Sequence, residues 1–350
     1  MSQKEETRKK NRLSILRWVP GFLISLIAVI ALLKFVPIDK AIEVLKTVPV
    51  TYYLLAALFT FIFLLVRAIG WQDLLGFKAN YKETFFKLSL GYFINNIFPF
   101  RLGELSRAVF MGAHLKVNPG KILSSIFLER VFDLIILAFF LLIMLPLVVG
   151  MAWVKTTAWM ILGGMVIGLA ILFFILQNSS RVEKVFEILE KKNNILVRMI
   201  IPFIRSLIDG LEILKNPKHL FIGFGGVLGS WLVSFVQFSV FLKLFVNDTE
   251  WWWGVFANSV LALGIALPSA PAGLGLYESS IVAGLKLFNI DESIALAFGL
   301  IMHISQFILI ALLGLFALYR DGYSIKNMFT QLMHFKEQIN KEKLSGETHV

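Results

Sequence analysis

Residues 99–103, Pro-Phe-Arg-Leu-Gly, interrupt one apolar segment of this chain, and residues 271–275, Pro-Ala-Gly-Leu-Gly, interrupt another in nearly the same way. Pro and Gly end helices. Inside a bilayer, broken backbone is tolerated only where protein or a water-filled cavity satisfies its polar groups. Matched interruptions in two halves point to a transporter-type binding site, although coincidence between two kinks is the alternative. The expected hairpin tips are formed by Pro99, Gly103, Pro268, Pro271, Gly273 and Gly275.

The composition predicts an all-α integral membrane protein. Of the 350 residues, 57% are hydrophobic, compared with about 45–50% in soluble domains. Several apolar runs exceed the roughly 18 residues that mark a membrane span. The chain has no cysteine, which excludes disulfides and thiolate catalysis. Its five histidines form no H-E-x-x-H motif, so we expect no metal and no cofactor.

Apolar runs predict the number of membrane segments. Two interrupted segments, residues 84–112 and 254–287, predict re-entrant hairpins that enter and leave the membrane on the same side. The uninterrupted runs predict full spans at residues 17–37, 52–73, 122–149, 157–177, 219–246 and 293–319.

The distribution of basic residues predicts the orientation. The formal net charge is +11, but the Lys and Arg residues lie between apolar runs rather than on a soluble domain, so we expect no nucleic-acid partner. Most of the 34 Lys and Arg residues fall in segments that this layout places inside, whereas the outer loops hold only Lys40, Lys46 and Lys155. This pattern predicts cytoplasmic termini and contact with an anionic inner leaflet.

The predicted spans divide the chain into two repeats. Residues 17–149 and 157–319 each contain three spans and one hairpin, and the odd number inverts the second repeat relative to the first. Inverted repeats with broken helices are typical of alternating-access carriers. Residues 178–218 predict an amphipathic cytoplasmic helix. Residues 1–16 form a basic cytoplasmic N-terminus, and residues 320–350 a cytoplasmic tail.

The first hairpin contains Asn96, Arg101, Glu104 and Arg107. On a helix, the last three are spaced by three residues and share one face. Charges at membrane depth are costly, so they face a cavity or one another. The arrangement predicts a site for a phosphate-bearing anion, because guanidinium groups bind phosphate well. The alternative is an internal Arg–Glu pair that closes the hairpin.

Three more charged residues, Glu129, Arg130 and Asp133, lie in the predicted span at 122–149. Glu129 and Asp133 are four residues apart and share a helix face. They are candidates for a proton or cation relay, or for counter-ions to Arg101 and Arg107.

In the second hairpin, Glu278 has no basic neighbour in the sequence. It is therefore a candidate for a carboxylate that changes protonation. Pairing with Arg101 or Arg130 is the alternative. His303 and Gln306 lie three residues apart on the last predicted span and face the same cavity or pack within the protein.

Three ordered motifs carry a resemblance to a known family. They read N-x2-P-x-R-x-G-E-x2-R from Asn96 to Arg107, E-R-x2-D from Glu129 to Asp133, and P-x2-P-x-G-x-G-x2-E from Pro268 to Glu278. Together they resemble the flippase-like membrane region of lysylphosphatidylglycerol synthases. The resemblance covers about residues 12–325. It implies an inner-membrane protein that moves a phospholipid or a lipid-linked intermediate between leaflets.

The resemblance also bounds the activity. In the synthases a soluble aminoacyl-transferase domain follows this region, whereas this chain ends soon after its last predicted span. We therefore expect a stand-alone member that is not an enzyme, with a lipid substrate and the capacity to form a homo-oligomer. Two alternatives remain open: a membrane-embedded enzyme acting on a lipid phosphate, and a small-solute transporter or accessory subunit of envelope synthesis.

Overall fold

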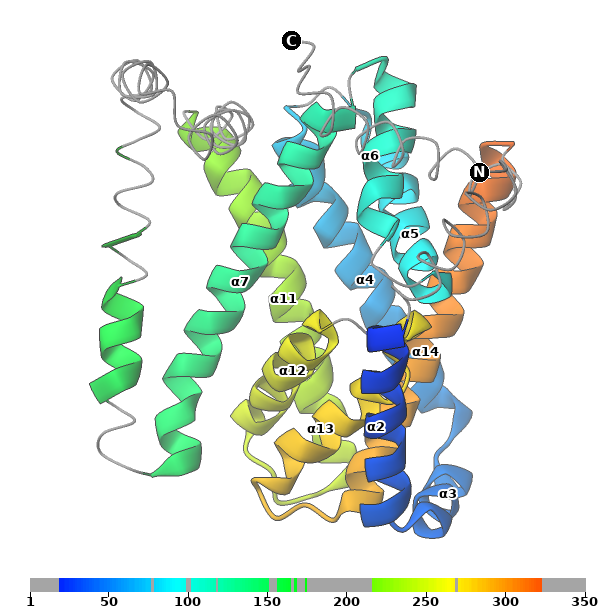
Figure 1. The fold of residues 1–350 in the computed structure, drawn as a ribbon, viewed down its shortest axis with the longest axis vertical. Coiled ribbons are helices and arrows are strands. Elements are labelled where there is room, and N and C mark those ends of the chain that lie inside the picture. Colours follow the sequence, from blue (N-terminus) through cyan, green and yellow to red (C-terminus); the bar gives the residue numbers. More distant parts are fainter. Residues whose placement is uncertain are drawn as a thin grey trace, which may run out of the picture. The chain divides into compact units, whose positions relative to one another are not determined.

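The computed structural model describes residues 19–76, 79–98, 102–117, 119–150, 156–164, 167–168, 174, 216–267 and 270–322. All regular elements within these ranges are helical, which confirms the all-α class (Figure 1). The expectations for residues 1–16, 178–215 and 323–350 lie outside the described residues. So do those for Pro99, Arg101 and Pro268.

Four described helices are long and apolar enough to cross a membrane: α4 (Val50–Leu74), α7 (Pro119–Val149), α11 (Pro217–Phe245) and α14 (Glu292–Arg320). Each overlaps one of the predicted spans. A shorter apolar helix, α2 (Val19–Phe35), lies in the predicted first span. The predicted span at 157–177 is described only in part, with helix over residues 156–164.

Both interrupted segments form broken helical pairs. The first comprises α5 (Tyr81–Ile97) and α6 (Leu102–Leu115). The second comprises α12 (Trp251–Ala266), the short 3-10 helix η2 (Pro271–Gly273) and α13 (Leu276–Lys286). The helices α5, α6 and α12 extend beyond the predicted limits at 84, 112 and 254. Those limits were set where the apolar stretch of sequence begins or ends. α5 starts earlier because the Asn80 side chain accepts from the Lys82 amide at 2.7 Å and caps a polar first turn.

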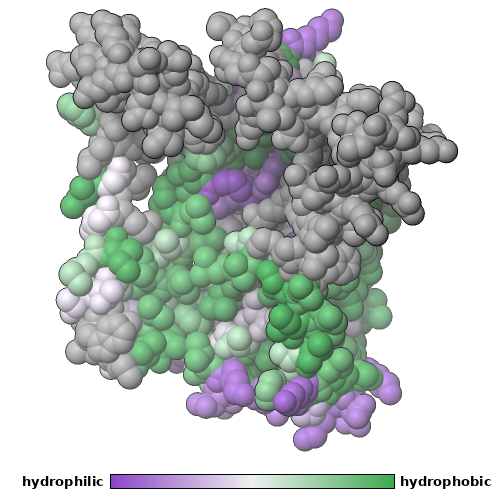
Figure 2. Space-filling model, viewed as in Figure 1, coloured by the Kyte–Doolittle hydropathy of each residue, from purple (hydrophilic) through white to green (hydrophobic). Residues whose placement is uncertain are grey.

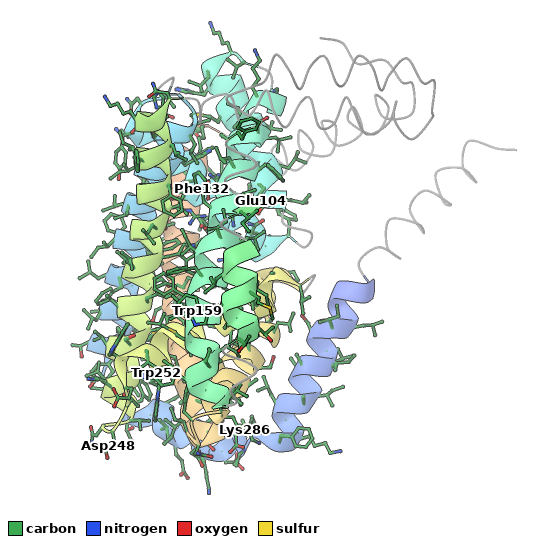
Figure 3. The ribbon with its side chains drawn as sticks, turned by 90° about the vertical axis from the view of Figure 1, so that its left-hand side faces the viewer. Glu104, Phe132, Trp159, Asp248, Trp252 and Lys286 are labelled. Carbon is green, nitrogen blue, oxygen red and sulfur yellow. The ribbon has the colours of Figure 1, made fainter. Side chains whose placement is uncertain are left out.

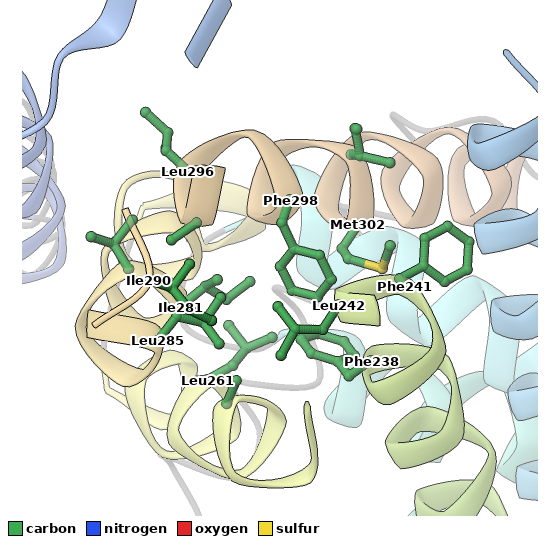
Figure 4. Packing of buried hydrophobic residues seen from close by; sticks show 14 of the residues in the cluster. Phe238, Phe241, Leu242, Leu261, Ile281, Leu285, Ile290, Leu296, Phe298 and Met302 are labelled. Carbon is green, nitrogen blue, oxygen red and sulfur yellow. The ribbon is translucent and has the colours of Figure 1, made fainter. Parts of the chain in front are cut away.

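The chain divides into two compact units. Unit 1 comprises Met1–Phe61, Ser89–Ser106 and Val233–Val350, and unit 2 comprises Ile62–Leu88 and Arg107–Leu232. In unit 1, α13 packs against α12, α14 and α2, and α14 also packs against α3 (Ile38–Thr47). Figure 4 shows the core of this unit, where Phe238, Leu261, Ile281, Phe298 and Met302 interdigitate.

Unit 2 is held by a close approach of two helix backbones. A Cβ atom on Gly226 of α11 would come closer than 3.0 Å to the backbone of Gly70 of α4. Small residues at such contacts let membrane helices approach closely. Beside this contact, the ring of Phe132 on α7 packs edge-on against the ring of Phe224, with centroids 5.3 Å apart.

The exterior of unit 1 suits a lipid environment. On α2 the large apolar side chains Leu23, Leu26 and Ile27 are exposed. Figure 2 shows apolar residues over much of the described surface, with hydrophilic residues at the end where α3 lies and in a second patch in the upper half of the view. In Figure 3, Trp252 and Lys286 lie near that same end, as expected where helices meet the membrane–water interface.

α3 lies in the segment between the predicted spans at 17–37 and 52–73, and Ile38–Thr47 is helical. Ala41 is buried on the side of this helix that packs within unit 1. The opposite face carries exposed charged residues, as in an amphipathic helix.

The start of α14 is fixed by Asp291. Its carboxylate accepts from the amide of Ser293 at 2.8 Å and from the amide of Ile294 at 3.4 Å. Burial raises the pKa of Asp291, but these donors outweigh it and hold that pKa below its ordinary value. The carboxylate therefore stabilises the folded state above the ordinary pKa of an unfolded Asp, about 3.9. This contribution is lost as the pH falls through the lowered value.

Asp291→Ala is therefore expected to lower the free energy of unfolding by about 1 kcal/mol at neutral pH, because an N-cap is removed. The difference from wild type should vanish in acid, below the lowered pKa. Asp291→Asn is the control, since Asn caps nearly as well but does not ionise. Thermal unfolding in detergent at neutral and acid pH measures both effects. An equal loss for Asp291→Ala at both pH values would contradict the assignment.

Candidate functional site

A buried ion network in unit 2 is centred on Glu129 of α7, whose side chain is 0% exposed. Arg67 of α4 donates to Glu129 Oε1 through Nε at 2.8 Å, and Nη2 lies 2.7 Å from the same oxygen. Arg107 of α6 donates to Glu129 Oε2 through Nη2. Arg130 donates to Oε1 through Nη2 at 2.8 Å. Three helices thus bring guanidinium groups to one carboxylate.

Asp133 extends the network by one turn of α7. Its Oδ2 lies 2.6 Å from Arg67 Nη2 and 3.1 Å from Arg130 Nη1. Its Oδ1 accepts from the indole Nε1 of Trp231 at 2.8 Å. Arg67 also donates to the Ser230 hydroxyl at 3.3 Å. Because isolated charges are expensive at membrane depth, these contacts explain how α4 and α7 tolerate ionised side chains.

The network combines three guanidinium groups with two carboxylates, so its named members carry a formal charge of +1. The side chains of Arg67 and Arg107 are 1% and 3% exposed, whereas that of Arg130 is 33% exposed. The guanidinium carbon of Arg107 lies 3.9 Å from the centroid of the Trp71 ring. An aromatic face stabilises a cation in this position. Trp71 is itself held by a hydrogen bond to Ser125 at 3.1 Å.

The structure brings together four of the expected site residues and adds one. Arg107, Glu129, Arg130 and Asp133 all belong to the network, and the counter-ion role considered for Glu129 matches its pairing with Arg107. The alternative of an internal Arg–Glu pair that closes the hairpin stays a prediction, because Arg101 lies outside the described residues. Arg67 was missed, although a charged residue inside an apolar span was a signal for it.

Beside the break in the first hairpin, α5 and α6 meet through close packing and a hydrogen bond. The Gly103 amide donates to the Asn95 side-chain oxygen at 2.7 Å. A Cβ atom on Gly103 would meet the Gly91 carbonyl oxygen, so only glycine fits where α6 crosses α5. Asn96 and Glu104, both expected at the site, are half-buried on α5 and α6.

The expectation that the two tips are alike in backbone is wrong at one described position, where Gly275 matches Gly103. Ala272, Gly273 and Gly275 have positive φ angles of 58°, 72° and 81°. Glycine adopts this conformation without steric cost. Gly103, by contrast, lies inside α6 and serves close packing. The 3-10 helix η2 begins at Pro271, and Gly275 precedes the first residue of α13, whereas Gly103 is the second residue of α6. The two matching glycines therefore occupy different backbone positions.

Glu278 is held at the start of α13 by two contacts within unit 1. Its Oε2 accepts from the Gly275 amide at 2.9 Å, and its Oε1 lies 2.7 Å from Nδ1 of His303 on α14. Glu278 and His303 are 6% and 7% exposed. His303 is therefore the described partner of Glu278, whereas Arg130 pairs with carboxylates on its own helix.

The imidazole of His303 also stacks on Tyr277. The two rings are 4.1 Å apart at an angle of 11°. The Tyr277 hydroxyl lies 3.5 Å from the Gln306 side-chain oxygen. His303 and Gln306, which were expected either to face one cavity or to pack within the protein, both contact the start of α13. Within the described ranges, no group of three or more His, Asp or Glu residues is arranged to hold a metal ion.

Apolar spanning helices, two broken helical pairs and a buried ion network define a polytopic α-helical membrane protein with a polar site among its spans. The family described as the lysylphosphatidylglycerol synthase TM region matches residues 18–314, and this chain belongs to it. This confirms the family that the three motifs resembled.

Two proteins of Methanocaldococcus jannaschii are similar over most of their length. UPF0104 membrane protein MJ1595 is 25% identical over 317 residues, which cover 85% of this chain and 92% of the relative. UPF0104 membrane protein MJ1078 is 28% identical over 228 residues, which cover 65% of this chain and 93% of the relative. No solved structure matches the chain.

Proposed function

We propose that this protein moves a phospholipid or lipid-linked intermediate between the leaflets of the cytoplasmic membrane, with both termini in the cytoplasm. The observation that carries the proposal is the ion network of unit 2, with three guanidinium groups around two carboxylates on membrane helices. The family supports a membrane role related to lipids. The basic segments between spans support the orientation and contact with an anionic inner leaflet.

The chemistry of the network suits a phosphate group. A guanidinium presents a fork of donors that binds phosphate oxygens in pairs. A phosphodiester carries one negative charge, which would bring the formal charge of the network to zero. Arg130 is the arginine of the network whose side chain is partly exposed, at 33%, so we assign the contact with the head group to it. Arg67 and Arg107 hold Glu129 in place behind it.

The proposal includes no chemical step on the lipid. Glu129 and Asp133 are engaged as counter-ions, which favours charge balance over acid–base catalysis. Recovery of chemically unchanged lipid after transport checks this point. A membrane-embedded lipid-phosphate enzyme would instead release a modified product from purified protein and lipid alone.

Arg130→Gln is expected to slow leaflet exchange of a labelled anionic phospholipid in proteoliposomes by about tenfold or more. The reason is that a hydrogen bond to a charged group contributes about 1.5–3 kcal/mol. Lys286→Gln is the matched control, because Lys286 has a 63% exposed side chain that pairs with Glu292 and belongs to unit 1, whereas the network belongs to unit 2. Thermal unfolding of both variants separates loss of folding from loss of transport.

Equal exchange by wild type and Arg130→Gln would contradict the head-group assignment. No exchange of any lipid by wild type would contradict lipid translocation itself. Competition by a soluble phosphate-bearing solute, without lipid movement, would favour a solute transporter.

A further inference from the structure

The two broken hairpins carry ion pairs of opposite arrangement. In the first half, Arg107 on the returning helix α6 pairs with Glu129 on the following span α7. In the second half, Glu278 on the returning helix α13 pairs with His303 on the following span α14. The base is on the hairpin in one case and on the span in the other. Each pair lies wholly within its own unit.

The two pairs differ in whether they can change charge. A guanidinium stays protonated under all physiological conditions. An imidazole is the side chain whose charge ordinarily changes between pH 5 and 8. The Arg107–Glu129 pair is therefore a fixed charge pair, whereas the pair formed by Glu278 and His303 can gain or lose a proton.

We propose that Glu278 and His303 form a proton-binding site, and that its occupancy drives the movement of lipid assigned above. The proposal rests on that proposed function for its coupling step, but proton binding itself does not. The ligand is a proton, taken up by the imidazole and released to water.

Burial determines which protonation state this geometry favours. With the proton bound, an imidazolium faces a carboxylate and the pair has no net charge. Without it, a neutral imidazole faces a carboxylate that is 6% exposed and carries an uncompensated charge. Such a charge is costly at membrane depth. Loss of the proton therefore favours a conformation in which the carboxylate reaches water, and proton occupancy and conformation are linked.

The contacts of Glu278 direct this effect to the hairpin tip. One carboxylate oxygen meets His303, and the other accepts from the amide of Gly275, at the left-handed turn before α13. A change in charge at His303 is thus transmitted through one side chain to the tip. The Tyr277 ring, stacked on the imidazole, stabilises its charged form as an aromatic face does any cation.

The neighbouring helices of unit 1 contain few other charged residues. α12 contains no charged residue, and α2 contains Lys34 near its end. Near Gly275, α2 contributes the backbone of Ser25 and Val29. Within unit 1, the described part of the first hairpin contains one charged residue, Glu104. The part of α11 that belongs to unit 1 contains Lys243. The charged residues of α3, which packs on α14, are Asp39, Lys40, Glu43 and Lys46.

The first test measures proton binding without lipid movement. Nitrogen-labelled histidine in the protein in nanodiscs gives a pair of signals from each of the five imidazoles, and the pair missing in His303→Gln supplies the His303 signal. We expect that signal to change with pH in wild type and to change over a different pH range in Glu278→Gln. A His303 signal that stays constant from about pH 5 to pH 9 would overturn the proposal.

The second test measures coupling in proteoliposomes that contain a labelled phospholipid. In wild type, a gradient of one pH unit is expected to shift the leaflet distribution of the lipid by up to about tenfold. The reason is that one pH unit corresponds to a tenfold ratio of proton activity across the membrane. His303→Gln should remove this dependence on the gradient. His219→Gln is the control, since His219 pairs with buried Asp73 at 3.1 Å in unit 2 and should leave the dependence intact.

The outcomes separate the two proposals. If wild type moves lipid with no response to the gradient, the coupling fails and lipid translocation stands. If wild type moves no lipid but His303 titrates, lipid translocation fails and the proton site stands. If His303→Gln does not fold, the wild-type titration and its change in Glu278→Gln still decide the proton site.

Discussion

Arg67→Gln is expected to lower the free energy of unfolding by about 3–5 kcal/mol, because removing one partner leaves buried charges without compensation. The Arg67 guanidinium contacts both carboxylates, with 2.7 Å to Glu129 and 2.6 Å to Asp133. Gln keeps a hydrogen-bond donor but no charge. The two carboxylates then lie one helical turn apart with less positive charge between them, in a part of unit 2 that is 0–8% exposed.

A double variant separates charge from packing. Arg67→Gln with Asp133→Asn removes one charge of each sign, so we expect it to unfold with less destabilisation than Arg67→Gln alone. The thermal unfolding temperature in detergent gives the ranking, and the full cycle with Asp133→Asn gives the interaction energy. A double variant no more stable than the single one would show that charge balance does not explain the role of Arg67.

Gly226→Ala is expected to destabilise unit 2 by about 1–3 kcal/mol, the usual cost of overpacking. The new methyl group would come closer than 3.0 Å to the backbone of Gly70, and backbone atoms cannot rotate away as a side chain can. α4 and α11 would have to separate, which would also disturb the contact of Arg67 with Ser230 between the same helices.

The adjacent residue offers a matched control. A Cβ atom on Gly225 would meet nothing within 4 Å, although it lies on the same helix. Gly225→Ala should therefore leave stability unchanged or raise it by up to about 1 kcal/mol, through the better helix propensity of Ala. Thermal unfolding of the two variants side by side measures the difference. Equal effects would mean that helix propensity, and not the contact with Gly70, determines the result.

Features that depend on local composition were predictable from the sequence. Apolar runs located α4, α7, α11 and α14 within a few residues, because a membrane span requires a continuous apolar stretch. Pro and Gly located both breaks for the same local reason. The motif E-R-x2-D likewise gave three members of the ion network, since residues four apart share a helix face.

Features that depend on which helices pack together were not predictable. Glu278 had two candidate partners in the sequence, Arg101 and Arg130, and His303 was considered separately. Its pairing with His303 depends on the packing of α13 against α14, which no local pattern encodes. The same holds for Arg67, whose role requires α4 to lie beside α7. The contact of Gly70 with Gly226 had a partial signal, the spacing of small residues at Gly223, Gly226 and Gly229.

The backbone conformations at the two breaks were also not predictable from the match between the two motifs. Identical letters at Gly103 and Gly275 suggested equivalent backbone, yet one residue packs helix on helix and the other occupies a left-handed turn. Glycine serves both purposes because it lacks a Cβ atom, so its presence alone does not distinguish them.

Two tryptophan side chains contact the ion network, so the intrinsic fluorescence of the protein reports on it. Trp71 lies under the guanidinium of Arg107, and Trp231 donates to the carboxylate of Asp133. The emission wavelength of an indole depends on nearby charges. Arrival of an anion at Arg130, or any rearrangement of its partners, should therefore register as a shift in intrinsic fluorescence. Substrates can be screened against the unlabelled protein in a cuvette, before any assay of leaflet exchange is built.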